Sequence, residues 1–192
     1  MTIHSNLNNF PSVDNQEDAI FAGGCFWCTE AVFLELDGVL KVVSGYIGGI
    51  TTNPDYKSIC TGQSGHAEAI RISFDPNKIS FGDLLEVFFA THDPTTLDKQ
   101  GNDVGTQYRS EIFFLSEDQK NISKDYIELM HQENTFPNPI VTKISAAPIF
   151  YVAEEYHQNY YNQNKSQGYC SFVITPKIEK LKKNFQYKLK IS

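Results

Sequence analysis

The sequence predicts an α+β fold: a mixed sheet packed against helices as a ferredoxin-like split βαβ sandwich, with a C-terminal extension. Two observations predict it. Candidate elements follow one another as strand, helix, strand, strand, helix, strand, which is the order of that fold. The chain has 192 residues, of which 41% are hydrophobic and 20% charged, and this length and composition suit one globular domain.

Glycines bound the first strand–helix–strand unit. A short apolar run at 18–22 fits a buried strand, and the glycine pair at 23–24 ends it. A helical pattern then covers 25–36, and Gly38 follows where a helix commonly stops. Apolar residues resume at 39–46, which predicts the second strand.

The third strand, at 66–75, has the clearest pattern. Its residues alternate between two sets, as they do in a strand with one face against a core. The set predicted to be buried is Glu68, Ile70, Ile72 and Phe74. We therefore expect the Glu68 carboxyl to point into the domain.

The helix predicted after the third strand begins with a capping signal. Ser80 and Asp83 resemble a capping box, and apolar residues within 81–89 recur at helical spacing. A fourth strand is predicted at 111–115 and a helix at 116–132. Beyond them we expect a further strand at 140–146, and then a tyrosine-rich helix at 153–164.

Charge and hydropathy bear on partners and location. The net charge of −7 argues against a nucleic-acid partner, which favours a basic surface. No apolar run is long enough to cross a membrane, so no membrane association is expected. The opening residues show no secretory signal. We therefore expect a cytoplasmic protein whose four cysteines stay reduced.

Two of these cysteines, Cys25 and Cys28, stand at the predicted start of a helix. Unpaired backbone N–H groups there favour thiolate over thiol, and thiolate is the nucleophile. Three interpretations remain open: a redox pair, part of a zinc site, or two small buried residues. Phe26 and Trp27 lie between the two thiols and form an apolar wall suited to a small hydrophobic group, which favours redox chemistry on a small ligand.

Other polar residues are candidates for the same chemistry. If Glu68 is buried, desolvation raises its pKa, so it suits either a general acid or an internal ion pair. Tyr56 and Tyr108 fall in predicted loops, where a phenol can donate to a ligand oxygen. His157 suits either a ligand or base, or an ordinary helical histidine.

Together, these residues resemble those of a known family, the peptide methionine sulfoxide reductases of type A. The matching segments run in family order over about residues 20–170, and they are more specific together than any one alone. They include Gly24-Cys25-Phe26-Trp27, Gly65-His66-Ala67-Glu68, Gly101-Asn102-Asp103, Gly105-Thr106-Gln107-Tyr108-Arg109-Ser110 and Gly168-Tyr169-Cys170.

The resemblance implies a role for each matching residue. Cys25 is expected to attack the sulfoxide sulfur of oxidised methionine, in the S epimer, while Glu68 protonates the oxygen. Hydrogen bonds to that oxygen are expected from Tyr56 and Tyr108. Phe26 and Trp27 are expected to form the pocket that receives the methyl group of the substrate. The polar network around the pocket is expected to include Asp103, His157 and Tyr169.

The resemblance also implies how the enzyme is regenerated. Attack leaves a sulfenic acid on Cys25, which a second thiol converts to a disulfide that thioredoxin reduces. Many relatives have glycine in place of Cys28 and their resolving cysteine at the position of Cys170. We prefer Cys170, while proximity favours Cys28 and a relay through both stays open. Neither a bound metal nor any other bound cofactor is implied.

The family assignment completes the expected organisation. We expect a flexible N-terminal arm (1–17), a single catalytic domain (18–170) and a lysine-rich C-terminal tail (171–192). The protein is expected to act as a monomer in the repair of oxidised proteins under oxidative stress, and the sequence leaves open whether free or protein-bound methionine sulfoxide is the main substrate. The alternatives are a thioredoxin-like disulfide oxidoreductase and a zinc-binding interaction module.

Overall fold

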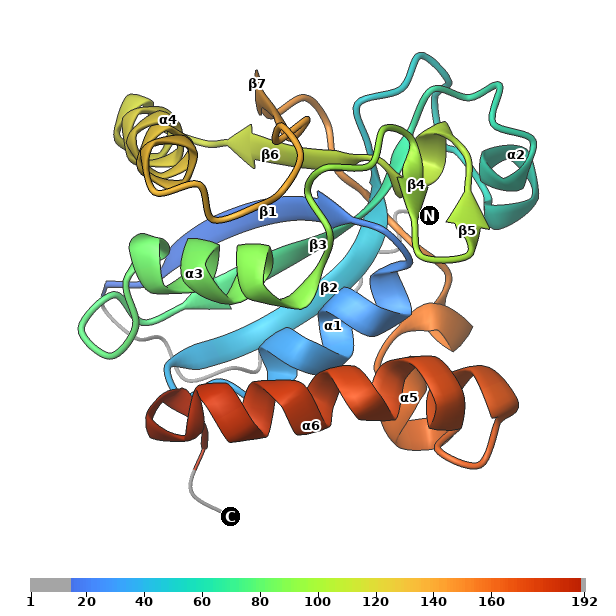
Figure 1. The fold of residues 1–192 in the computed structure, drawn as a ribbon. Coiled ribbons are helices and arrows are strands. Elements are labelled where there is room, and N and C mark those ends of the chain that lie inside the picture. Colours follow the sequence, from blue (N-terminus) through green and yellow to red (C-terminus); the bar gives the residue numbers. More distant parts are fainter. Residues whose placement is uncertain (1–14, 191–192) are drawn as a thin grey trace.

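A computed structural model describes residues 15–190 and shows a six-stranded mixed sheet with helices packed against it (Figure 1). The strand order is β7-β6-β1-β3-β2-β8. The four central strands β6, β1, β3 and β2 pair with one another antiparallel, so that β3 separates the parallel strands β1 and β2, and the edge strand β7 pairs parallel to β6. This is the split βαβ arrangement, so the predicted fold is confirmed. The strands are β1 (Glu17–Gly23), β2 (Val39–Ile47), β3 (Ala67–Phe74), β6 (Ser110–Phe114), β7 (Lys143–Ala146) and β8 (Tyr151–Val152).

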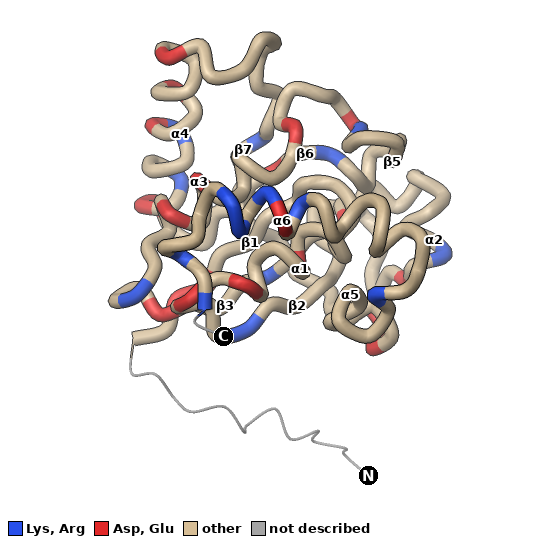
Figure 2. The backbone as a smooth tube through the Cα atoms, turned by 60° about the horizontal axis from the view of Figure 1, so that its bottom comes forward, with Lys and Arg blue, Asp and Glu red and all other residues tan. Residues whose placement is uncertain are grey.

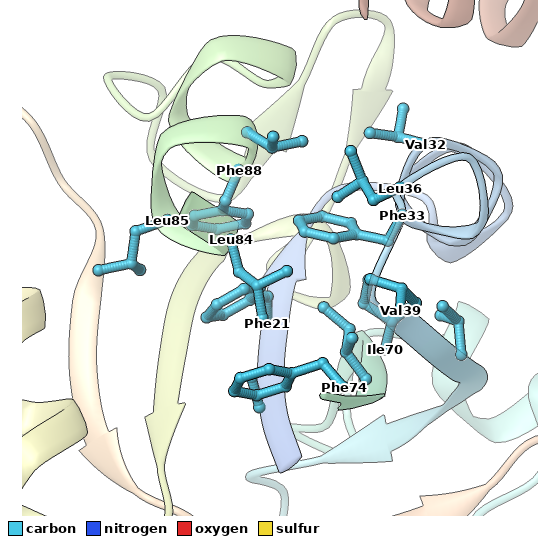
Figure 3. Packing of buried hydrophobic residues seen from close by; sticks show 14 of the residues in the cluster. Phe21, Val32, Phe33, Leu36, Val39, Ile70, Phe74, Leu84, Leu85 and Phe88 are labelled. Atoms are coloured by element: carbon cyan, nitrogen blue, oxygen red, sulfur yellow. The ribbon is translucent and has the colours of Figure 1, made fainter. Parts of the chain in front are cut away.

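Helices α1 (Phe26–Leu34) and α3 (Phe81–Thr91) pack on one face of this sheet. Figure 3 shows their side chains meeting those of β1 and β3. The Phe21 and Phe88 rings are stacked with centroids 4.9 Å apart, between strand and helix. The predicted capping box begins α3, since the Asp83 N–H donates to the Ser80 hydroxyl and the Ser80 N–H donates to the Asp83 carboxylate.

The two faces of β3 meet different surroundings. Ile70 and Ile72 belong to the core under the helices, whereas Ala67 and Ala69 face a smaller cluster on the other side of the sheet. Glu68 therefore lies on the helix-covered face, as the alternation predicts, and only 2% of it is exposed.

Helix α4 (Glu117–Gln132) packs beside α3 and the outer strands, close to the predicted bounds. The predicted helix over 153–164 is wrong. The chain forms a 3-10 turn (Glu155–His157) and then a four-residue helix, α5 (Tyr160–Gln163), with a break at Asn159. Asn159 has a left-handed φ of 51°, which a continuous right-handed helix does not accommodate.

Several short elements escaped prediction because they have no extended periodicity. They are α2 (Tyr56–Cys60), which is capped by Asp55, and the hairpin of β4 (Lys99–Gln100) and β5 (Asp103–Val104). A 3-10 turn (Thr106–Tyr108) follows the hairpin.

The lysine-rich segment after residue 170 folds against the rest of the chain. A π-helical turn (Cys170–Ile174) continues into α6 (Thr175–Asn184), and Ile178 and Leu181 of α6 are buried. Lysine positions recur along this segment (Figure 2). Two of these side chains form ion pairs with the body: Lys182 pairs with Glu35, and Lys188 with Asp83 and Glu86.

The predicted N-terminal arm lies almost entirely outside the described residues, and its last residue, Glu17, begins β1. Within residues 15–190, no helix is both long and apolar enough to cross a membrane.

Candidate active site

Cys25 occupies the N-cap position of α1, directly after the central strand β1. Gly24 makes the turn between them with φ +96°, and a Cβ there would lie 2.5 Å from a side-chain carbon of Gln100. Glycine is therefore required at this position by both conformation and space. The turn leaves Cys25 9% exposed, at the edge of a pocket.

Glu68 approaches the same helix start from β3. Its carboxylate accepts a hydrogen bond of 3.0 Å from the backbone N–H of Phe26, the residue after Cys25. Burial raises the pKa of Glu68 to about 8, although the Phe26 hydrogen bond acts in the opposite direction. Glu68 is consequently protonated at neutral pH, beside the Cys25 backbone, as a general acid has to be.

The expectation that the helix start lowers the pKa of Cys25 is wrong. Burial of the Cys25 thiol raises its pKa, and the neighbouring Cys28 and Glu68 act in the same direction. The hydrogen bond from Cys25 instead lowers the pKa of Cys28 to about 7, and Lys177 contributes to this shift. Cys28 thus holds the more acidic of the two thiols.

Tyr56 and Tyr108 come from two short elements near Glu68. Burial, together with the charge of Glu68, raises the pKa of both phenols, so both remain hydrogen-bond donors. The Tyr56 backbone N–H donates to Glu154 over 2.9 Å. Tyr108 ends the 3-10 turn, whose first carbonyl accepts a hydrogen bond of 3.0 Å from the Arg109 guanidinium.

Phe26 and Trp27 form an aromatic wall with residues from the segment after β8. The Trp27 indole N–H donates to His157 Nδ1 over 3.0 Å, and Phe26 lies 5.0 Å from the same imidazole, centroid to centroid. The Tyr160 ring is stacked on Trp27 at 3.8 Å with an interplanar angle of 6°. Because Nδ1 accepts a hydrogen bond, the neutral His157 carries its proton on Nε2.

A second group of residues lines the pocket beside the cysteines. The Tyr169 hydroxyl donates to Asp103 over 2.9 Å and lies 3.6 Å from Cys28 Sγ. The pocket has a volume of about 470 Å³, and Phe172 and Lys177 are among the other residues that line it. Asp103 and Tyr169 therefore adjoin the thiols, and the Tyr169 ring also meets Trp27 of the aromatic wall edge to face, with centroids 5.9 Å apart.

Cys170 is fully buried and packs in one cluster with Cys25 and Cys28. It begins the π-helical turn, a distortion that occurs often at functional sites. All four cysteines carry free thiols, and Cys60 is exposed on α2. Among the described residues, no group of three or more histidine, cysteine or acidic side chains is arranged to hold a metal.

The structure thus brings together the residues that the sequence singles out, and it adds others that sequence reasoning missed. Glu154 binds both the Tyr46 hydroxyl and the Tyr56 N–H. Glu30 is buried behind the aromatic wall. The available signal for Glu30 was an acidic residue inside the otherwise apolar helix that begins at Phe26.

Comparisons with known proteins agree with this site. The family model for peptide methionine sulfoxide reductase matches residues 17–189. Peptide methionine sulfoxide reductase MsrA from Deinococcus radiodurans is 57% identical over 190 residues, which cover 99% of this chain and 92% of the relative. The protein of that name from Acinetobacter baumannii is 53% identical, over 91% of this chain and 99% of its own.

Solved structures show the same similarity. Mxr1 from Saccharomyces cerevisiae in reduced form has a TM-score of 0.75 and 35% identity, covering 83% of this chain and 91% of its own. Methionine sulfoxide reductase A of Corynebacterium diphtheriae has a TM-score of 0.71 and 33% identity, with coverage of 82% and 79%. Mxr1 in complex with Trx2 aligns with a TM-score of 0.54 and 27% identity, covering 80% of this chain and 91% of its own.

Proposed function

The chain belongs to the peptide methionine sulfoxide reductase family and is a methionine sulfoxide reductase, and from this premise we propose how its own residues perform the reaction. The substrate is the S epimer of methionine sulfoxide, free or in proteins. Cys25 is the nucleophile and Glu68 the acid. The observation that carries this proposal is the hydrogen bond from Phe26 N–H to the buried Glu68 carboxyl, beside Cys25.

Protonation of the oxygen is the role of Glu68. A sulfoxide is a poor electrophile until its oxygen is protonated or strongly hydrogen-bonded, so an acid with a raised pKa suits the site. Tyr56 and Tyr108 support the same oxygen as neutral donors, because burial raises the pKa of both phenols. The wall of Phe26 and Trp27 receives the methyl group of the substrate.

Attack then transfers the oxygen. The Cys25 sulfur bonds to the sulfoxide sulfur as the sulfoxide oxygen takes the Glu68 proton, and the thiol proton of Cys25 replaces it on the neighbouring Glu68 carboxylate. The oxygen then passes to the Cys25 sulfur as the sulfur–sulfur bond and the original sulfur–oxygen bond break. Methionine leaves reduced, and Cys25 keeps the oxygen as a sulfenic acid, so the Cys25 sulfur loses the two electrons that the substrate gains. Asp103, His157 and Tyr169 complete the polar surroundings, the first and last through their mutual hydrogen bond.

A second thiol regenerates Cys25. We propose that Cys170 forms the disulfide, either directly or through a first disulfide between Cys25 and Cys28, and that water is released. Packing of the three thiols in one cluster supports either route. Thioredoxin then reduces the disulfide; a related yeast protein, Mxr1, has been crystallised with Trx2. No bound cofactor takes part in this scheme.

Thioredoxin-dependent repair of this kind requires a reducing compartment, so we propose that the protein acts in the cytoplasm. We propose a monomer as the active form, because Glu68 and the three clustered thiols already meet in one site within the chain.

Trapping the first intermediate tests this assignment. A Cys28→Ser, Cys170→Ser variant, treated with methionine-S-sulfoxide without reductant, should release one methionine per chain. It should also gain one oxygen atom on Cys25, located by a sulfenic-acid reagent and mass spectrometry. Labelling at another residue, or release of methionine without any labelling, would remove Cys25 from the nucleophile's role.

A further inference from the structure

Glu30 is a buried acidic side chain that takes part in none of the steps above. It lies on α1, one turn after Phe26, and only 1% of it is exposed. Its two carboxylate oxygens accept separate hydrogen bonds, of 2.8 Å from the backbone N–H of Asn159 and of 3.2 Å from that of Tyr160. Burial raises the pKa of Glu30 to about 7, and the two backbone donors act in the opposite direction. The ionised side chain holds those donors firmly, because hydrogen bonds to a charged group are stronger than hydrogen bonds between neutral groups.

The segment held by Glu30 has little local support. Asn159 is left-handed, and α5 has only four residues. A helix this short does not form by itself in water, and its first N–H groups need outside partners. Glu30 supplies two of those partners from a different helix. The path of residues 157–160 is thus fixed by two tertiary contacts: Glu30 of α1 binds the backbone at 159–160, and the Gln158 side chain binds the backbone of Ser44 in β2.

This segment provides two of the partners of Trp27. His157 accepts the indole hydrogen bond at 3.0 Å, and Tyr160 is stacked on the indole at 3.8 Å. Trp27 itself is only partly buried, so its orientation depends on these neighbours. The contacts therefore run from the Glu30 carboxylate through the backbone of 159–160 to the indole.

We propose that Glu30 is a positioning residue for substrate binding: its carboxylate fixes residues 157–160, and they hold Trp27 in the orientation that receives the methyl group of the sulfoxide. Glu30 touches neither the reacting sulfur nor the oxygen, so it acts on binding more than on the chemical step. The inference rests on the proposed function in one respect, the role of Trp27 as the methyl-binding wall.

Glu30→Gln is the direct test. The amide keeps one acceptor oxygen but turns an NH2 donor toward a backbone N–H, so one hydrogen bond is replaced by a repulsive contact. Glu35→Gln, at the other end of the same helix, where the native carboxylate pairs with Lys182, is the matched control. Both variants are measured as full-length protein with thioredoxin as reductant.

Three results are expected for Glu30→Gln and not for Glu35→Gln. The KM for methionine-S-sulfoxide rises about tenfold while kcat changes less than twofold. Amide hydrogen exchange at Asn159 and Tyr160 accelerates about tenfold or more. The fluorescence of Trp27, the one tryptophan of the chain, changes because the indole loses its fixed partners. Unchanged exchange and fluorescence, or a loss confined to kcat, would overturn the proposal.

Tyr160→Leu keeps the test decisive if Glu30→Gln does not fold. It removes the stacked ring while leaving the backbone N–H groups for Glu30, so KM should rise with the protection of those amides retained. An unchanged KM in this variant would equally contradict the proposal. The exchange and fluorescence measurements do not depend on catalysis, so they distinguish failure of this inference from failure of the proposed reaction.

Discussion

The substitution Glu68→Gln tests the acid role without disturbing the helix start. Glutamine is nearly the same size, and its amide oxygen can still accept the hydrogen bond of 3.0 Å from Phe26 N–H. What the variant loses is the proton that Glu68 donates. General acid catalysis contributes about 10²–10⁴-fold, so the single-turnover rate constant should fall by that factor, which corresponds to about 3–5 kcal/mol in activation free energy.

The pH dependence of the single-turnover rate constant gives a second, independent test of the acid role of Glu68. With a pKa of about 8, Glu68 is about 90% protonated at pH 7. The protonated form is the active one, so the wild-type rate should be level below pH 7 and fall about tenfold per pH unit above pH 8. Glu68→Gln should be slow throughout and lack this inflection.

The same pKa affects the stability of the fold. Since the pKa of Glu68 rises from 4.5 to about 8 on folding, the folded state binds this proton more tightly. The contribution of Glu68 protonation to the free energy of unfolding is full below pH 4.5. It is lost as the pH rises toward 8, which lowers the free energy of unfolding by a few kcal/mol. Glutamine does not titrate, so Glu68→Gln does not lose this stabilisation. Its free energy of unfolding, measured with denaturant at pH 9, should therefore exceed that of the wild type.

The assay is rapid-quench single turnover of methionine-S-sulfoxide from pH 6 to 10, with Glu35→Gln as a control for loss of a carboxylate elsewhere on the body. An unchanged rate constant in Glu68→Gln would remove Glu68 from the role of general acid, and so would a Glu68→Gln profile that keeps the wild-type inflection.

Three further predictions concern the rest of the site. Cys170→Ser should abolish thioredoxin-dependent steady-state turnover yet retain the first turnover; if only Cys28→Ser loses steady-state turnover, the preference for Cys170 is wrong. Tyr56→Phe and Tyr108→Phe should each slow single turnover about tenfold and together about a hundredfold, because each removes a hydrogen-bond donor to the sulfoxide oxygen. Rate constants equal to that of the wild type would exclude the two tyrosines from this role. Gly24→Ala should lower the free energy of unfolding by about 1–3 kcal/mol, measured by urea denaturation, because alanine is strained at φ +96°; equal stability would contradict this.

Local sequence signals account for the framework that carries the site. The alternation in β3 places Glu68 under the helices because a strand's side chains necessarily point to opposite faces. The capping pattern at Ser80 likewise marks the start of α3. These features depend on neighbours in the chain, and the sequence contains those neighbours.

The predictions that proved wrong concern features that depend on residues far away in the sequence or on the tertiary fold. The helix predicted over 153–164 is interrupted because Glu30, far away in the sequence, binds the backbone N–H groups of Asn159 and Tyr160. Helix α2 is too short for its apolar residues to show a period. The pKa of Cys25 departs from expectation because burial depends on the tertiary fold, whereas the helix-end effect depends on local position.

In the proposed reaction, Cys25 reduces the S epimer of methionine sulfoxide and thioredoxin supplies the electrons. A thioredoxin-coupled assay on the two separated epimers, with the wild type and with Cys25→Ser, tests it most directly. We expect the wild type to turn over the S epimer and little of the R epimer, and we expect Cys25→Ser to turn over neither. Retained turnover in Cys25→Ser, or equal turnover of both epimers by the wild type, would contradict it.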